Sequence, residues 1–169
     1  MATEHKSLDE DEQEEPLMLS LSSSDEDTFT ILQKAVRLSK MLSSAIEMDP
    51  DATELDVSVS SPTLQRVVQY LTHYVDDQPR KLQPPLTSTD LKEYVDDWDA
   101  EFVATLSKKD LYDLLLAANY MDIQPLLHLC CAKVATYIKG KPIAEMEKEL
   151  AALRGEPKQK DDEEMEKKS

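Results

Sequence analysis

The sequence predicts an α/β fold in which a few short strands come first and the C-terminal half is helical. Two observations lead to this prediction. Segments in which apolar and polar residues alternate, a pattern typical of half-buried strands, occur before residue 60. Apolar residues three or four positions apart, the spacing of one helix face, dominate the chain beyond residue 110.

Three strands are expected near the N-terminus. Residues 17–21 and 28–32 alternate, and the serine-rich acidic segment 22–27 between them is typical of a turn, so the pair predicts a hairpin. Residues 55–59 alternate strictly and predict a third strand. Between the hairpin and this strand, apolar residues at helical spacing in 35–46 predict the first helix.

The next helix has a recognisable start. Ser60 or Ser61 provides a capping hydroxyl and Pro62 fits the first turn, which predicts a helix that runs to about Tyr74. Residues 76–89 are rich in proline and predict a long exposed loop.

Two further helices are predicted in the C-terminal half. The first has its apolar residues within 111–118 and ends at residues 119–122. The second, from Gln124 to Ile138, is apolar on two faces, so it must be covered twice. Its first stripe is Leu126, Leu129, Cys130 and Tyr137, and its second stripe is Leu127, Cys131, Val134 and Ile138. One stripe belongs to the core, and the other is covered either by more of the core or by a partner.

A short amphipathic helix is expected after that. Gly140 and Pro142 end the preceding helix. The apolar residues that follow have the 3-4-3 spacing of a two-heptad seam, called the C-terminal seam here. They are Ile143, Met146, Leu150 and Leu153. Gly155 stops this helix.

Charge divides the chain and excludes some functions. Residues 1–28 hold ten acidic side chains against one lysine, and residues 156–169 hold six acidic against four basic ones. We therefore expect a disordered acidic arm over 1–16 and a disordered charged tail over 155–169. The net charge of −16 argues against nucleic-acid binding, and two glycines in the whole chain exclude glycine-rich phosphate-binding loops.

No catalytic, metal or cofactor site is predicted. Cys130 and Cys131 are adjacent, the three histidines are far apart, and the densest carboxylates, in 96–101, lie beside a solvated loop. The chain has no secretory segment and no apolar run of membrane-spanning length, so no membrane association is expected. Free thiols and the lack of a signal predict a cytoplasmic and nuclear protein that is not an enzyme.

Three motifs in the C-terminal half carry a family resemblance. They are Trp-Asp-Ala-Glu-Phe at 98–102, Leu-Leu-Ala-Ala-Asn-Tyr-Met-Asp-Ile at 115–123, and the segment 134–141 that ends in Ile-Lys-Gly-Lys. Their order resembles the S-phase-kinase-associated (Skp) adaptor family, whose members bridge a cullin scaffold to F-box substrate receptors in ubiquitin ligases. The resemblance implies a BTB/POZ-type α/β domain over 17–123, a small sheet flanked by helices. It also implies dimerisation or F-box-binding helices over 124–154.

The resemblance also implies two binding surfaces. The positions that seat F-box helices are matched here by Phe102, Leu127, Cys131, Val134 and Ile138. The positions that face the cullin are matched by Asn119 and Tyr120. One departure concerns the C-terminal clamp on the F-box, because Pro142 directly follows Lys141 and the tail has no aromatic residue. The C-terminal seam is then free to lie against an F-box helix, to pair with another helical partner, or to fold back over the second stripe.

The expected function is that of a non-catalytic adaptor of an SCF-type E3 ubiquitin ligase, with an F-box protein and a cullin as partners. Two alternatives are kept. In one, the chain is a structural subunit that binds one F-box-like protein without a cullin. In the other, it is a self-associating BTB module, and a weak homodimer forms when partners are absent.

Overall fold

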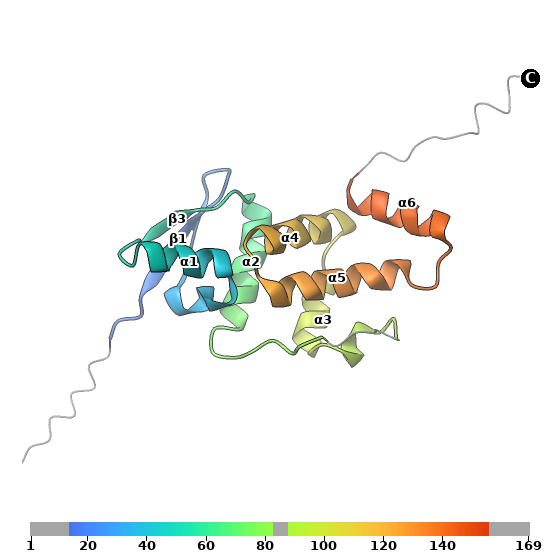
Figure 1. The fold of residues 1–169 in the computed structure, drawn as a ribbon, viewed down its shortest axis with the longest axis horizontal. Coiled ribbons are helices and arrows are strands. Elements are labelled where there is room, and N and C mark those ends of the chain that lie inside the picture. Colours follow the sequence, from blue (N-terminus) through green and yellow to red (C-terminus); the bar gives the residue numbers. More distant parts are fainter. Residues whose placement is uncertain (1–13, 83–87, 156–169) are drawn as a thin grey trace, which may run out of the picture.

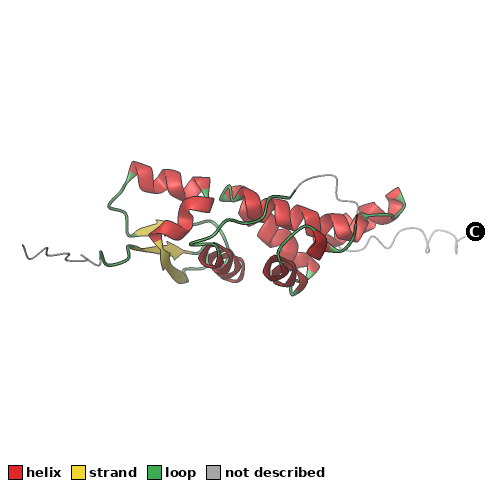
Figure 2. Cartoon of the chain, turned by 90° about the horizontal axis from the view of Figure 1, so that it is seen from below, coloured by secondary structure: helices red, strands yellow, loops and turns green. Residues whose placement is uncertain are grey.

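The structure is a computed structural model, and it describes residues 14–82 and 88–155. Its N-terminal elements are β1 (Met18–Ser22), β2 (Thr28–Leu32), the 3-10 helix η1 (Gln33–Leu38), α1 (Lys40–Met48), β3 (Glu54–Asp56) and α2 (Ser61–His73). Its C-terminal elements are the 3-10 helix η2 (Leu91–Glu93), α3 (Asp97–Ala104), α4 (Lys108–Tyr120), α5 (Gln124–Ile138) and α6 (Ile143–Leu153). The sheet and α1 lie at one end of an elongated body, and α6 lies at the other end (Figures 1 and 2).

The predicted hairpin is confirmed, and β1 is the central strand. The strand order is β2-β1-β3, with β1 antiparallel to β2 and parallel to β3. The third strand is shorter than predicted. Val57 is buried and its N–H still donates to the carbonyl of Ser22 on β1 at 2.8 Å. The chain then bends away from β1, because the N–H of the buried Val59 donates to the carbonyl of Val57 at 2.8 Å. The N–H of Ser24 then donates to the carbonyl of Val59 at 2.9 Å, which ties this bend to the hairpin turn.

The predicted helix over 35–46 is wrong as one continuous element. The chain breaks at Ser39, whose backbone is extended (φ −100°, ψ 113°), so that η1 precedes it and α1 follows it. The Ser39 side chain is fully buried; its hydroxyl accepts from the N–H of Leu42 and donates to the carbonyl of Met121 at 2.6 Å. This contact joins segments 82 residues apart, which periodicity along the chain does not reveal.

Helix α2 begins and ends as predicted, and the hairpin turn caps it. Ser60 makes no side-chain capping bond. Instead, the carboxylate of Asp25 accepts from both the N–H and the hydroxyl of Ser61 at 2.8 Å. Hydrogen bonding lowers the pKa of Asp25, and the bond from the side-chain hydroxyl of Ser61 has the largest effect. A negative group at a helix N-terminus is also favourable for the helix dipole.

The proline-rich segment forms neither helix nor strand in its described part, and residues 83–87 lie outside the described residues. Two elements after it were not predicted, η2 and α3. Helix α3 carries Trp98 and Phe102, so the sequence segment taken for a loop edge is helical. The predicted acidic arm and charged tail fall mainly on residues 1–13 and 156–169, which lie outside the described residues.

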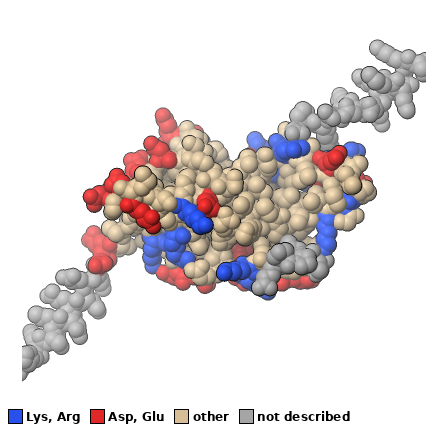
Figure 3. All heavy atoms as spheres, viewed as in Figure 1, with Lys and Arg blue, Asp and Glu red and all other residues tan. Residues whose placement is uncertain are grey.

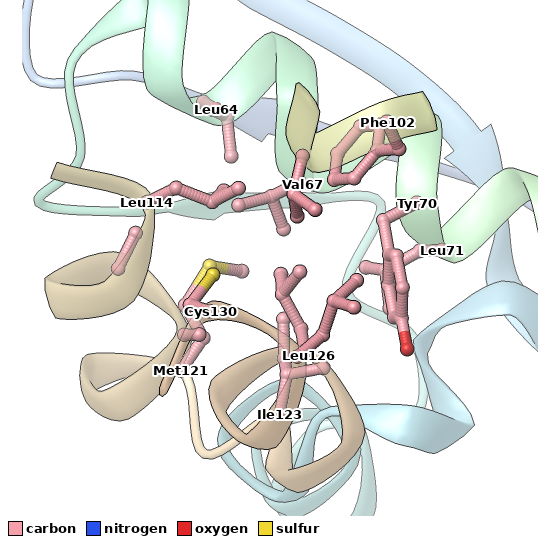
Figure 4. Close-up of a cluster of buried hydrophobic side chains, with 14 of the residues drawn as sticks. Leu64, Val67, Tyr70, Leu71, Phe102, Leu114, Met121, Ile123, Leu126 and Cys130 are labelled. Carbon is pink, nitrogen blue, oxygen red and sulfur yellow. The ribbon is translucent and has the colours of Figure 1, made fainter. Parts of the chain in front are cut away.

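The hydrophobic core extends from the sheet to the C-terminal helices, and a large part of it lies between α2, α4 and α5. This part is shown in Figure 4, where side chains of the three helices point toward one another and Phe102 of α3 closes one side. The labelled side chains are Leu64, Val67, Tyr70, Leu71, Phe102, Leu114, Met121, Ile123, Leu126 and Cys130. All of them are buried, so this core holds α4 and α5 in fixed positions and determines which of their faces stay exposed.

Candidate protein-docking surfaces

The two stripes of α5 differ in burial. Leu126, Leu129 and Cys130 of the first stripe are buried, and Tyr137 is half-buried. In the second stripe Leu127, Val134 and Ile138 are half-buried, and Cys131 is exposed. The second stripe is therefore an apolar face that the described part of the chain covers only in part. The structure brings these four predicted residues together on one helix face.

The two neighbouring thiols have no sign of nucleophilic activation. Burial raises the pKa of Cys130 to about 12, and partial desolvation also raises the pKa of Cys131. A reactive cysteine needs the opposite change, a lowered pKa beside a positive charge or a helix N-terminus. Both thiols are protonated at neutral pH and act as small apolar groups.

Phe102, the fifth residue predicted for the F-box surface, lies in a different environment. It is 8% exposed, and its ring stacks on Trp98 with a centroid distance of 5.0 Å. It lines a surface hollow of about 220 Å³ between α2 and α3. The other lining residues are Arg66, Gln69, Trp98, Glu101, Thr105 and Leu106. None of these lining residues comes from α5, and the role of Phe102 stays a prediction.

Trp98 is half-buried and is held in place by aromatic neighbours. The ring of His73 stacks on the ring of Trp98, with a centroid distance of 3.6 Å and an interplanar angle of 3°. The ring of Phe102 also stacks on Trp98, with an interplanar angle of 12°. Beneath this cluster the hydroxyl of Tyr74 donates to Asp99 at 2.6 Å. The second oxygen of Asp99 has no hydrogen-bond partner among the described residues, and burial raises the pKa of Asp99 and of Tyr74.

A second exposed face lies at the end of α4. Asn119 and Tyr120 are exposed, Tyr120 to 47%, and the Tyr120 hydroxyl accepts from the N–H of Ser58 at 3.5 Å. Leu116, one turn earlier on the same side of the helix, is also 47% exposed. The sequence analysis did not single out Leu116, because an apolar residue within an amphipathic helix is usually part of the core. The signal in the sequence was its spacing of four residues from Tyr120, which puts the two side chains on the same face of the helix.

The end of α4 is held firmly, which fixes this face. Met121 and Ile123 are fully buried, and Asp122 between them has a left-handed backbone (φ 49°) that ends the helix. The buried contact from Ser39 to the carbonyl of Met121 ties the same turn to α1. Residues 116–120 are thus presented on a rigid helix rather than on a loop.

The C-terminal seam is divided by the fold. Helix α6 packs on α4 and α5 through Leu153, which is 2% exposed, while Ile143 and Leu150 stay exposed. Glu149 accepts from the ammonium groups of Lys108 and, at 2.9 Å, of Lys141. These bonds, led by the one from Lys108, lower the pKa of Glu149 to about 2. The third possibility for this seam was that it folds back over the second stripe. The helix does fold back onto the body of the chain, but the second stripe stays partly uncovered.

The described residues offer no other obvious site. Within 14–82 and 88–155, no three His, Cys, Asp or Glu side chains are grouped as metal ligands would be. Among the helices of the same residues, none has the length and apolar character needed to cross a membrane.

Comparison with known proteins gives matches along both halves of the chain. The model described as "Skp1 family, tetramerisation domain" matches residues 17–76, and "Skp1 family, dimerisation domain" matches residues 124–168. The S-phase kinase-associated protein 1 homolog of Tetrahymena thermophila is 34% identical over 77% of this chain and 79% of its own. The suppressor of kinetochore protein 1 of Schizosaccharomyces pombe is 32% identical over 73% and 78%. The E3 ubiquitin ligase complex SCF subunit sconC of Arthroderma otae is 30% identical over 77% and 79%.

Proposed function

The chain belongs to the Skp1 family, and from that membership we propose that it is the adaptor subunit of an SCF-type E3 ubiquitin ligase. The family and the BTB/POZ-type α/β fold predicted from the sequence are both confirmed. The name of a relative, an SCF subunit of an E3 ubiquitin ligase complex, supports the ligase assignment. In this role the chain bridges a cullin scaffold to F-box substrate receptors.

One observation carries this proposal: α5 keeps a second apolar stripe that the chain itself leaves partly uncovered. A face of this kind on a rigid helix is a seat for another apolar helix, and its burial by the partner is the main source of affinity. Val134 and Ile138 lie in the C-terminal half of the stripe, and helix α6, which packs on α5, carries the exposed Ile143 and Leu150. We assign the F-box to this surface.

The cullin is assigned to the face of α4 that holds Leu116, Asn119 and Tyr120. Apolar and aromatic side chains that are half-exposed on a fixed helix are typical of interface centres. The two faces lie on different helices, so both partners can bind at once. The chain then acts by positioning, because it holds the receptor and the scaffold in one orientation and needs no catalytic group of its own.

The double substitution Val134→Asp and Ile138→Asp tests the assignment. Two buried, unpaired carboxylates at the interface should abolish F-box binding in a pull-down and leave cullin binding intact. The control Gln65→Asp with Ala104→Asp adds the same charge at exposed positions of α2 and α3 and should bind both partners. Loss of both partners in the stripe variant, with the control unaffected, contradicts the two-surface arrangement.

The alternative without a cullin is tested separately. Two features of the sequence favour this alternative. Pro142 directly follows Lys141, and the printed sequence has no aromatic residue after Tyr137. Both features alter the F-box clamp expected from the resemblance. Asn119→Ala with Tyr120→Ala should abolish cullin binding if the chain is an adaptor. If the unsubstituted protein binds an F-box protein but no cullin, the dedicated structural subunit is the correct function. We propose the cytoplasm and nucleus as its compartments, where its free thiols stay reduced.

A further inference from the structure

The exposed face of α4 ends beside the edge of the sheet. The Tyr120 hydroxyl accepts from the N–H of Ser58, so the tyrosine lies against the segment that leaves β3. In the described sheet β3 is an edge strand, because the order is β2-β1-β3. The Tyr120 end of the apolar face therefore lies close to the C-terminal end of β3, and the side chains exposed there border it.

Those side chains are acidic. Glu54 and Asp56 are exposed on β3, and the whole segment 41–65 contains five acidic residues and no basic one. The acidic turn of the hairpin, residues 25–27, lies close to the segment after β3, since the N–H of Ser24 donates to the carbonyl of Val59 at 2.9 Å and the carboxylate of Asp25 accepts from the N–H of Ser61 at 2.8 Å. On β3 itself, Glu54 accepts from the hydroxyl of Ser22 at 2.6 Å. In Figure 3 acidic atoms gather over the end of the molecule that carries β3.

One basic residue stands on the other side of this face. The N–H of Lys40 donates to the carbonyl of Asp122, just beyond Tyr120, at 3.1 Å. The carboxylate of Asp122 accepts from the side-chain amide of Gln124 at 2.6 Å, and the salt bridges among the described residues include neither Glu54 nor Asp56. The α4 face thus has an apolar centre and an acidic border along β3.

We propose that the partner surface bound by the α4 face carries lysine or arginine side chains that meet Glu54 and Asp56. The proposal rests on the proposed function, in which this partner is the cullin scaffold, and it specifies the chemistry of the contact. Charges at the rim of an interface act mainly on the rate of association, because they steer the encounter while the apolar centre supplies most of the affinity. The net charge of −16 adds a long-range attraction for a basic surface.

A second copy of this chain fits the face poorly. A twofold contact brings the same patch of both molecules together, so it would place two acidic borders in one interface. Like charges across an interface are unfavourable, and no basic residue lies within 41–65 to pair with them.

The experiment measures association and dissociation rates of a purified cullin with the full chain at several salt concentrations. Glu54→Gln with Asp56→Asn removes two charges and keeps similar shapes and a hydrogen-bond acceptor for Ser22. Glu93→Gln with Glu147→Gln removes two exposed charges on η2 and α6 and is the matched control. Tyr120→Ala is included to report on the apolar centre.

At low salt the β3 variant should associate about tenfold more slowly than the unsubstituted chain, and the difference should vanish near 0.5 M salt, where screening is nearly complete. The control pair should change the association rate by less than about twofold, with dissociation rates similar throughout. Equal rates for the β3 and control variants, or faster association of the β3 variant, overturn the proposal. Unchanged cullin binding by Tyr120→Ala overturns the proposed cullin face instead, so the two failures are distinguishable.

Discussion

The two apolar stripes of α5 have similar composition and different surroundings. Leu126 and Cys130 are fully buried by α2 and α4, whereas Leu127 and Cys131, each the next residue along the chain, are half-buried and exposed. The sequence gives both stripes the same apolar character, so hydrophobicity alone does not say which is core. What differs is the number of neighbouring elements that the fold brings to each side.

This difference separates stability from binding on one helix. The first stripe is covered on folding and contributes to the free energy of unfolding. The second stripe is covered only in part, so its apolar residues are a cost in solubility that the proposed F-box surface explains.

The largest expected effect is the difference in alkylation rate between Cys130 and Cys131. Cys131 is exposed, whereas Cys130 becomes accessible only when the core opens and also has a pKa of about 12. With a thiol reagent at mildly alkaline pH, Cys130 should react at least about a thousandfold more slowly. Peptide mass spectrometry over time measures both rates. The rates should become equal in denaturant, and an added F-box protein should protect Cys131 if it binds the second stripe. Comparable rates in the native protein would show that the two faces are not distinct.

The next effect is on stability. Leu126→Ala removes a fully buried side chain and should lower the free energy of unfolding by about 2–5 kcal/mol. Val134→Ala on the half-buried second stripe should cost about 1 kcal/mol or less in the free protein. Urea denaturation of both variants measures the two values. Equal losses would mean that the second stripe is covered by the chain itself.

Local signals were sufficient for some elements. The start of α2 was predicted correctly because the first-turn proline, Pro62, acts within a few residues, although the cap comes from Asp25 of the hairpin turn and not from Ser60. The break at Ser39 was missed because its cause is the carbonyl of Met121, far along the chain. Helix α3 was missed because Trp98 and Phe102 form one aromatic cluster with His73 and Tyr70 of α2, a tertiary arrangement that composition does not encode.

The candidate surfaces were predictable to different degrees. The second stripe was found because residues four and seven positions apart on a helix share a face whatever covers it. Leu116 was missed because exposure depends on what packs against α4 rather than on its own sequence. Phe102 came from the family resemblance, and the structure places it in the core beside a hollow of α2 and α3. Periodicity therefore identifies faces, and only the fold shows which of them are free.

The smallest effect concerns α6, which is intermediate between the covered and uncovered regions. Glu149→Gln removes the charge that receives the ammonium groups of Lys108 and Lys141. Because ion pairs near the surface are weak, amide exchange of α6 should rise only about two- to fivefold, while amides of α5 near Leu126 stay unchanged. Hydrogen exchange read by mass spectrometry measures both, with Glu147→Gln on the same helix as the control.

Acid should have the same effect as this substitution. The pKa of Glu149 is lowered in the fold from 4.5 to about 2, so its contribution is present above pH 4.5 and is lost as the pH falls through about 2. NMR signals of the Leu153 methyl groups should shift over that window in the unsubstituted chain and much less in Glu149→Gln. Signals of the Leu126 methyl groups report whether the core is still intact at each pH. If the Leu153 signals of both proteins shift identically, Glu149 does not hold α6, and Leu153 alone attaches this helix to the body.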